Sequence, residues 1–111
     1  MRKCLAVCLF LIPVSIFARG GQFNTGNNLK SDCFRENGTF NSGFCMGYII
    51  GVADNNSYKI FAPGGQGGVT QGQFRDIVKK YLNDNTAQLH RDADILVLNA
   101  LQQAFPCPEN K

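Results

Sequence analysis

The sequence predicts an all-α fold: a small bundle of about four helices, stabilised by a disulfide. Apolar residues recur at the helical period in three separate segments, and alternating patterns typical of strands are few. Three cysteines lie downstream of an N-terminal segment typical of exported proteins, whose thiols are oxidised. In such a fold the apolar stripes meet in a narrow core and the opposite helix faces are solvated.

The N-terminal residues 1–20 are predicted to be a signal peptide. Arg2 and Lys3 precede an uncharged apolar run, and small residues predict cleavage near 18–20. The run is too short for a transmembrane anchor, which takes ~20 apolar residues. A buried N-terminal helix is the weaker alternative, because a basic pair before so unbroken a run is atypical of a domain. We therefore expect a single helical domain over 21–111, with no membrane attachment after signal removal.

The net charge of this predicted mature chain excludes an electrostatic argument for nucleic-acid binding. The full chain has 11 basic and 8 acidic residues. Removal of residues 1–20 takes away three basic residues, Arg2, Lys3 and Arg19, which leaves eight of each sign. Without a net positive charge or a basic run, we expect no nucleic-acid partner.

Two helices are predicted in the first half of the domain. Thr25 is a suitable N-cap for a short helix that ends near Phe34. Ser42 is the predicted N-cap of a second helix through Ala53, whose apolar stripe is Cys45, Ile49 and Val52. This second helix also contains Gly47 and Gly51. Because each interior glycine costs ~1 kcal/mol relative to alanine, their spacing predicts that another element approaches the helix backbone closely.

The third helix has the clearest local signal. Thr70 and Gln73 have the spacing of a capping box. An apolar stripe follows, and charged residues occupy most of the opposite face. The stripe consists of Phe74, Ile77, Val78 and Tyr81, and the charged residues are Arg75, Asp76, Lys79 and Lys80.

The last helix is predicted from about Asp92 to Phe105, after a polar break at 83–86. Two apolar stripes cover most of its surface, so it belongs in the middle of the domain. One stripe contains Ala93, Val97, Ala100 and Ala104, and the other Ile95, Leu98, Leu101 and Phe105. Pro106 and Pro108 end the helix.

No catalytic or metal-binding constellation stands out. His90 is the only histidine, the carboxylates are scattered, and the cysteines do not have the spacing of a zinc site. A catalytic Cys–His pair would need a reduced thiol, whereas the cysteines of an exported chain are expected to form disulfides. We therefore expect a binding protein with no enzymatic activity, no metal and no cofactor.

Four separate motifs resemble one known family. They run from Cys45-Met46-Gly47-Tyr48-Ile49-Ile50-Gly51-Val52-Ala53-Asp54 through Gly68-Val69-Thr70-Gln71-Gly72-Gln73 and Val78-Lys79-Lys80-Tyr81-Leu82 to Leu96-Val97-Leu98-Asn99-Ala100-Leu101 with Ala104-Phe105-Pro106-Cys107. In order and spacing they are similar to the Rap/Tai family of type VI secretion system amidase immunity proteins. The resemblance implies a small helical periplasmic protein, often a homodimer, that blocks the active site of a secreted peptidoglycan amidase.

The cysteines depart from the family pattern. Cys33 matches the first family cysteine, but Ala62 stands where the family has another, so one expected disulfide is missing. If the main helices run up, up and down, Cys45 and Cys107 gather at one end with Cys33 nearby. Our prediction is a Cys33–Cys107 bridge that leaves Cys45 free, with a stabilisation of ~4 kcal/mol.

Candidate contacts to the amidase lie on the polar connector and on the exposed side of the third helix, because loops on a rigid scaffold commonly carry binding. The candidates are Asn83, Asp84, Asn85, His90, Arg91 and Lys79. Two other functions remain open: a small periplasmic chaperone-like or structural binding protein, which would have exposed apolar patches, and a small hydrolase, which the lack of a site disfavours.

Overall fold

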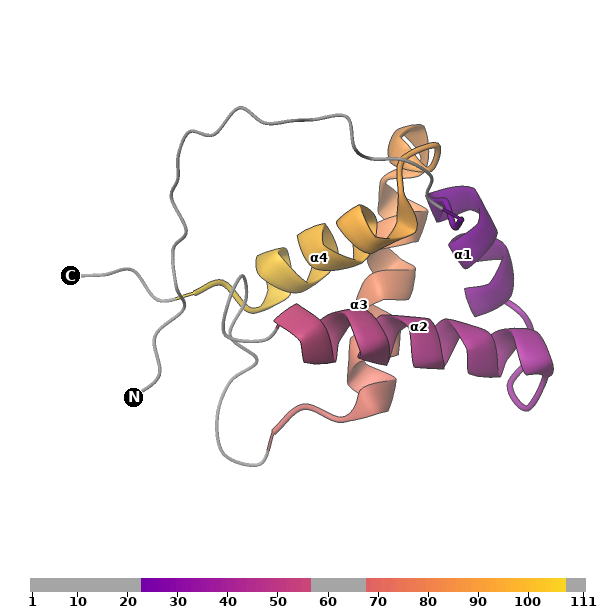
Figure 1. Cartoon of the computed structure of the whole chain (residues 1–111), viewed down its shortest axis with the longest axis horizontal. Coiled ribbons are helices and arrows are strands. Elements are labelled where there is room, and N and C mark those ends of the chain that lie inside the picture. Colours follow the sequence, from indigo (N-terminus) through magenta and orange to yellow (C-terminus); the bar gives the residue numbers. More distant parts are fainter. Residues whose placement is uncertain (1–22, 57–67, 108–111) are drawn as a thin grey trace.

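The computed structural model describes residues 23–56 and 68–107 (Figure 1). Over these residues the chain forms four α-helices: α1 (Gly26–Cys33), α2 (Phe40–Asn56), α3 (Gln71–Asp84) and α4 (Ala93–Ala104). A short 3₁₀ helix, η1 (Thr86–Gln88), connects α3 to α4. The predicted all-α bundle is confirmed, whereas the predicted signal peptide lies outside the described residues.

Side-chain caps start three of the helices. Thr25 Oγ1 accepts a hydrogen bond from Asn28 N at the start of α1, at 3.3 Å. Thr70 and Gln73 form both bonds of the predicted capping box, at 3.1 and 2.8 Å. The predicted start of α2 was wrong: Thr39 Oγ1 accepts from Ser42 N at 3.1 Å, so α2 begins three residues earlier than expected.

The core lies where the four helices meet, and α4 contributes most to it. Five residues of α4 are buried: Ala93, Leu96, Val97, Ala100 and Leu101. This confirms the central place predicted for α4, which contacts α1, α2 and α3. Two details differ from the expected stripes, because Leu96 is fully buried and Ala104, at the end of the helix, is exposed.

The helices α2 and α3 cover this core with one side each. Cys45, Ile49 and Ala53 are the buried residues of α2, and Val78 and Leu82 are those of α3. Phe74 and Phe105 meet edge to face with ring centroids 5.7 Å apart, which closes the core between α3 and the end of α4. No helix within the described ranges is both long and apolar enough to cross a membrane.

The disulfide joins Cys33 to Cys45, so the predicted Cys33–Cys107 bridge and the free Cys45 were both wrong. The reason is local. After α1 ends at Cys33, a turn with Gly38 at φ +88° brings the first turns of α2 against α1. The two cysteines then face each other inside the core, with Cα atoms 5.0 Å apart.

The surroundings of the α2 glycines also differ from the prediction. A Cβ atom built on Gly47 or Gly51 would meet no atom within 4 Å, so no described element approaches the helix there. The close approach occurs instead at Gly26, where a Cβ would collide with the Leu96 side chain and lie 2.9 Å from the Leu89 carbonyl oxygen. The start of α1 therefore requires glycine, whereas the fold leaves the two α2 glycines unexplained.

Removal of the Cys33–Cys45 bridge should lower the free energy of unfolding by about 3 kcal/mol, because the bridge closes a loop of about a dozen residues. Urea unfolding of Cys33→Ala, Cys45→Ala and the double variant tests this. Since either substitution breaks the same bond, the three losses should be similar. Losses that add in the double variant would contradict the pairing, and Ser31→Ala, on the exposed side of α1, is the control.

Candidate functional site

The chain between α3 and α4 forms a rigid polar projection, residues 85–92, which we name the η1 edge. Figure 1 shows it at one extremity of the ribbon, beyond the end of α3. Two hydrogen bonds join its backbone to the start of α1: Gly26 N donates to the Arg91 carbonyl oxygen and Asn27 N to that of Leu89, each at 2.9 Å. Leu89 is buried beneath the turn, which anchors the edge to the core.

Further hydrogen bonds fix the η1 edge from within. Gln88 N donates to the Asn85 carbonyl oxygen, and Arg91 N to that of Gln88, both at 2.9 Å. The Arg91 guanidinium donates to Gln88 Oε1 at 3.1 Å. The backbone is therefore preorganised, and binding through this surface would lose little additional backbone entropy.

Five of the six predicted contact residues share this end of the bundle. Asn83, Asp84, His90 and Arg91 are exposed, and Asn85 is half-buried. Three of the five are already engaged within the chain, among them Arg91, whose guanidinium is bonded to Gln88. Asp84 forms an ion pair with Lys80 at 2.8 Å, and Asn85 Nδ2 donates to the Tyr81 carbonyl oxygen at 2.8 Å. His90 and Arg91 are the exposed members on the η1 edge itself, and the bond to Gln88 holds the Arg91 guanidinium in its exposed position.

Lys79 does not belong to this group. Its ammonium lies 4.7 Å from the centroid of the Phe34 ring, at the end of α1, where Lys30 also lies over the ring at 5.7 Å. The helical period places Lys79 on the α1 side of α3, whereas Lys80 and Asp84 lie on the α4 side. The structure therefore separates Lys79 from the η1 edge.

A groove between α3 and α4 was not predicted. It encloses about 340 Å³ and opens beside the η1 edge, with the Lys80–Asp84 ion pair at its rim. Its lining residues are Ile77, Lys80, Tyr81, Asp84, Asn85, Ala100, Gln103 and Ala104. The sequence signal for it is the pair of small residues, Ala100 and Ala104, one turn apart on α4 opposite larger α3 side chains. A partner that binds the edge could extend a side chain into this groove.

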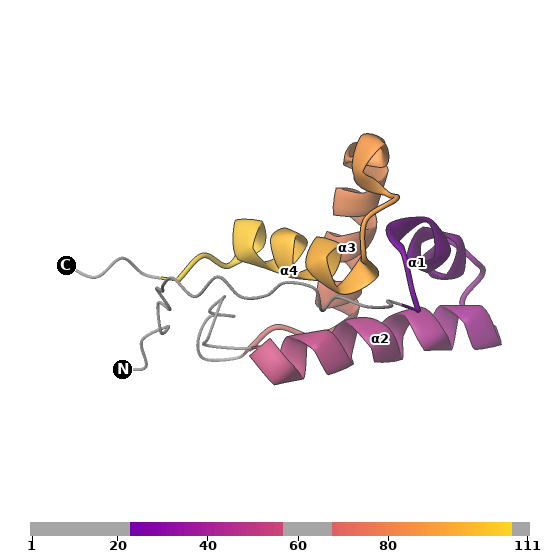
Figure 2. The same cartoon turned by 45° about the horizontal axis from the view of Figure 1, so that its top comes forward.

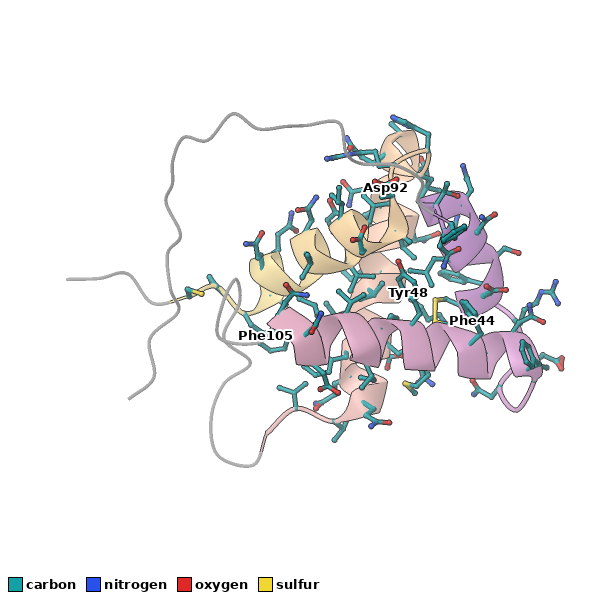
Figure 3. The ribbon with its side chains drawn as sticks, in the orientation of Figure 1. Phe44, Tyr48, Asp92 and Phe105 are labelled. Atoms are coloured by element: carbon teal, nitrogen blue, oxygen red, sulfur yellow. A yellow bond between two sulfur atoms is a disulfide. The ribbon has the colours of Figure 1, made fainter. Side chains whose placement is uncertain are left out.

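Tyr48, on α2, lies near the Asp92 and Asp94 carboxylates at the start of α4; Figure 3 labels Tyr48 and Asp92. Partial burial raises the pKa of its phenol, and the nearby Asp94 and Asp92 carboxylates raise it further. A hydrogen bond with the Asp94 backbone acts in the opposite direction. The phenol is therefore a neutral group that connects α2 to the start of α4.

The described residues, 23–56 and 68–107, contain no cluster of three or more His, Cys, Asp or Glu side chains that could hold a metal. His90 is exposed on the η1 edge, whereas Cys33 and Cys45 are bonded to each other in the core. What the geometry offers here is a surface for binding.

A protein-family model described as Rap1a immunity proteins matches residues 25–107. The chain belongs to the Rap1a immunity protein family. The match contains all four α-helices and the η1 edge, so it covers the whole described bundle. It confirms the family resemblance of the sequence motifs and assigns this Rap1a protein an immunity role against a type VI secretion effector. No curated protein matches the chain.

The stability of this Rap1a protein should depend on Tyr48 above pH 10. In the unfolded chain the phenol ionises at its ordinary pKa of 10.0, and in the folded chain at a higher value. Above pH 10 the unfolded state therefore binds fewer protons, and the free energy of unfolding falls as pH rises. Urea unfolding between pH 8 and pH 11 should show a smaller fall for Tyr48→Phe than for the wild type. An identical fall in the wild type and in Tyr48→Phe would contradict the assignment.

Proposed function

We propose that this Rap1a protein acts in the periplasm, where it binds a type VI secreted peptidoglycan amidase and occludes its active-site cleft. Family membership supports the immunity role, and the η1 edge is the structural observation that carries the proposed mechanism. A convex, polar and preorganised projection is the shape that complements a concave enzyme site. The toxin is then inhibited because its substrate can no longer enter.

The η1 edge alone is too small for a stable complex. An interface of standard size buries about 800 Å² on each partner, or some 20–30 residues. The outward side of α3 adjoins the edge and presents exposed polar residues. These are Gln73, Asp76, Lys80 and Asn83. We propose that this side of α3 forms the periphery of the interface, whereas His90 and Arg91 form its centre, where a few residues carry most of the binding energy.

The proposed assembly includes a homodimer, as the family resemblance implies. The alternative of a chaperone-like protein gains support from one observation, the exposed phenyl rings of Phe40 and Phe44 on α2. A chaperone would bind many unfolded proteins weakly, whereas an immunity protein binds one folded effector tightly. Binding to a panel of unfolded polypeptides distinguishes the two functions.

The substitution Arg91→Ala should weaken binding of the amidase by about 1 kcal/mol or more, a fivefold or larger increase in Kd. Arg91 combines exposure with a guanidinium held in place by Gln88. Titration calorimetry with the cognate amidase measures the change. Lys30→Ala is the control cation, because Lys30 lies over the Phe34 ring on α1, outside the proposed interface. An unchanged Kd for Arg91→Ala would remove this residue from the interface.

Deletion of residues 1–20 should retain the protein in the cytoplasm and abolish protection against an amidase directed to the periplasm. The same truncated chain with an unrelated signal peptide should restore protection. Cell fractionation and survival of the producing cells measure the two effects. Protection by the truncated chain alone would contradict a periplasmic site of action.

A further inference from the structure

One face of α2 is apolar yet uncovered by the bundle. Phe40 is 81% exposed and Phe44 is 44% exposed. Gly47 and Gly51 lie on the same face, which we name the outer α2 face and define by these four residues. It is opposite Cys45, Ile49 and Ala53, which point into the core. Figure 2 shows α2 along one margin of the ribbon, with its outer side turned away from the other helices.

The composition of α2 indicates a permanent partner. No charged residue occurs from Phe40 to Ala53, and a helix that is apolar all round is normally buried on all sides. Interfaces of obligate complexes are more apolar than interfaces of transient complexes. A toxin that arrives from another cell is an occasional partner, and the immunity protein must stay soluble before it comes. A second copy of the same chain, by contrast, is always present.

The order of large and small residues along α2 fits a two-fold symmetric pair. The phenylalanines lie in the N-terminal half of the outer α2 face, and the glycines in its C-terminal half. In an antiparallel pair, a two-fold axis between residues 45 and 46 places Phe44 opposite the partner's Gly47. The same axis places Phe40 opposite the partner's Gly51. Both pairs thus share one register, and each ring faces a residue without a side chain.

The neighbouring features of α2 agree with this register. No residue within 23–56 or 68–107 approaches Gly47 or Gly51, so within this part of the chain both positions are open to a ring from another molecule. The Cys33–Cys45 bridge also holds α2 in place beside the axis.

We propose that the outer α2 face is the homodimer interface, in which two α2 helices pack antiparallel with Phe40 and Phe44 seated on the glycines of the second copy. This inference rests on the homodimer of the proposed function and not on the identity of the toxin. The interface leaves the η1 edge accessible, because α2 and the η1 edge lie on opposite sides of the ribbon (Figure 2). It also assigns a role to two helix glycines that the monomer fold leaves unexplained.

An exchange of residues tests the register. Gly47→Phe alone should place two phenyl rings against each other, and Phe44→Gly alone should remove the ring that packs on the partner's Gly47. Each should therefore raise the dimer Kd by about 100-fold. The double variant, Phe44→Gly with Gly47→Phe, should recover most of the dimer, because each ring again faces a glycine. Analytical ultracentrifugation of the purified protein over a range of concentrations measures the Kd. Ser31→Phe, on the exposed side of α1, is the control and should remain a dimer.

The outcomes separate the parts of the proposal, with circular dichroism used to verify that each variant keeps its helices. Recovery in the double variant supports the antiparallel register. A dimer that survives both single substitutions overturns the assignment to α2 while the homodimer stands. A double variant that stays monomeric overturns the antiparallel register. A monomeric wild type overturns the homodimer itself. None of these results depends on amidase binding, which calorimetry on the η1 edge tests separately.

Discussion

The fold depends on the contact between the start of α1 and the start of α4. Ala93 N donates to the Asn24 carbonyl oxygen at 2.9 Å, in line with the bonds that Gly26 and Asn27 make to the η1 edge. Gly26 lies so close to Leu89 and Leu96 that no larger residue fits. One short segment thus ties the first helix to the last, and it also fixes the surface proposed to meet the toxin. The proposed effector surface and the fold therefore depend on the same hydrogen bonds.

The helix that makes this contact cannot form by itself. With eight residues, α1 is shorter than the ~12–15 residues at which isolated helices become marginal in water. It is held at its N-terminus by the η1 edge and at its C-terminus by the Cys33–Cys45 bridge. The Leu29 side chain is fully buried between these two anchors. The disulfide and the η1 edge therefore fix opposite ends of the same helix.

Local signals in the sequence predicted the four helices, but they failed at the start of α2 and did not predict the contacts between distant segments. Thr25 and Thr70 cap as expected because a capping bond needs only three residues of chain. The Cys33–Cys45 pairing depends on how sharply the chain reverses after α1. The exposure of Gly47 depends on which helices pack against α2. Of the candidate site, the clustering over 83–91 followed from chain proximity. The separate position of Lys79 and the α3–α4 groove required the packing of α3 between α1 and α4.

The η1 edge and the outer α2 face differ in polarity, and this difference matches the partner proposed for each. A surface that is exposed until a toxin binds has to be stable in water. The η1 edge meets this condition, because its exposed side chains are polar and its backbone forms hydrogen bonds within the chain. A surface that is covered from the moment of folding can be apolar, and the outer α2 face has phenyl rings and glycines with no charge among them. If both faces met the toxin, the apolar one would be exposed in every cell that had not yet been attacked, at the risk of aggregation. The difference in chemistry between the two faces is therefore an argument for two partners.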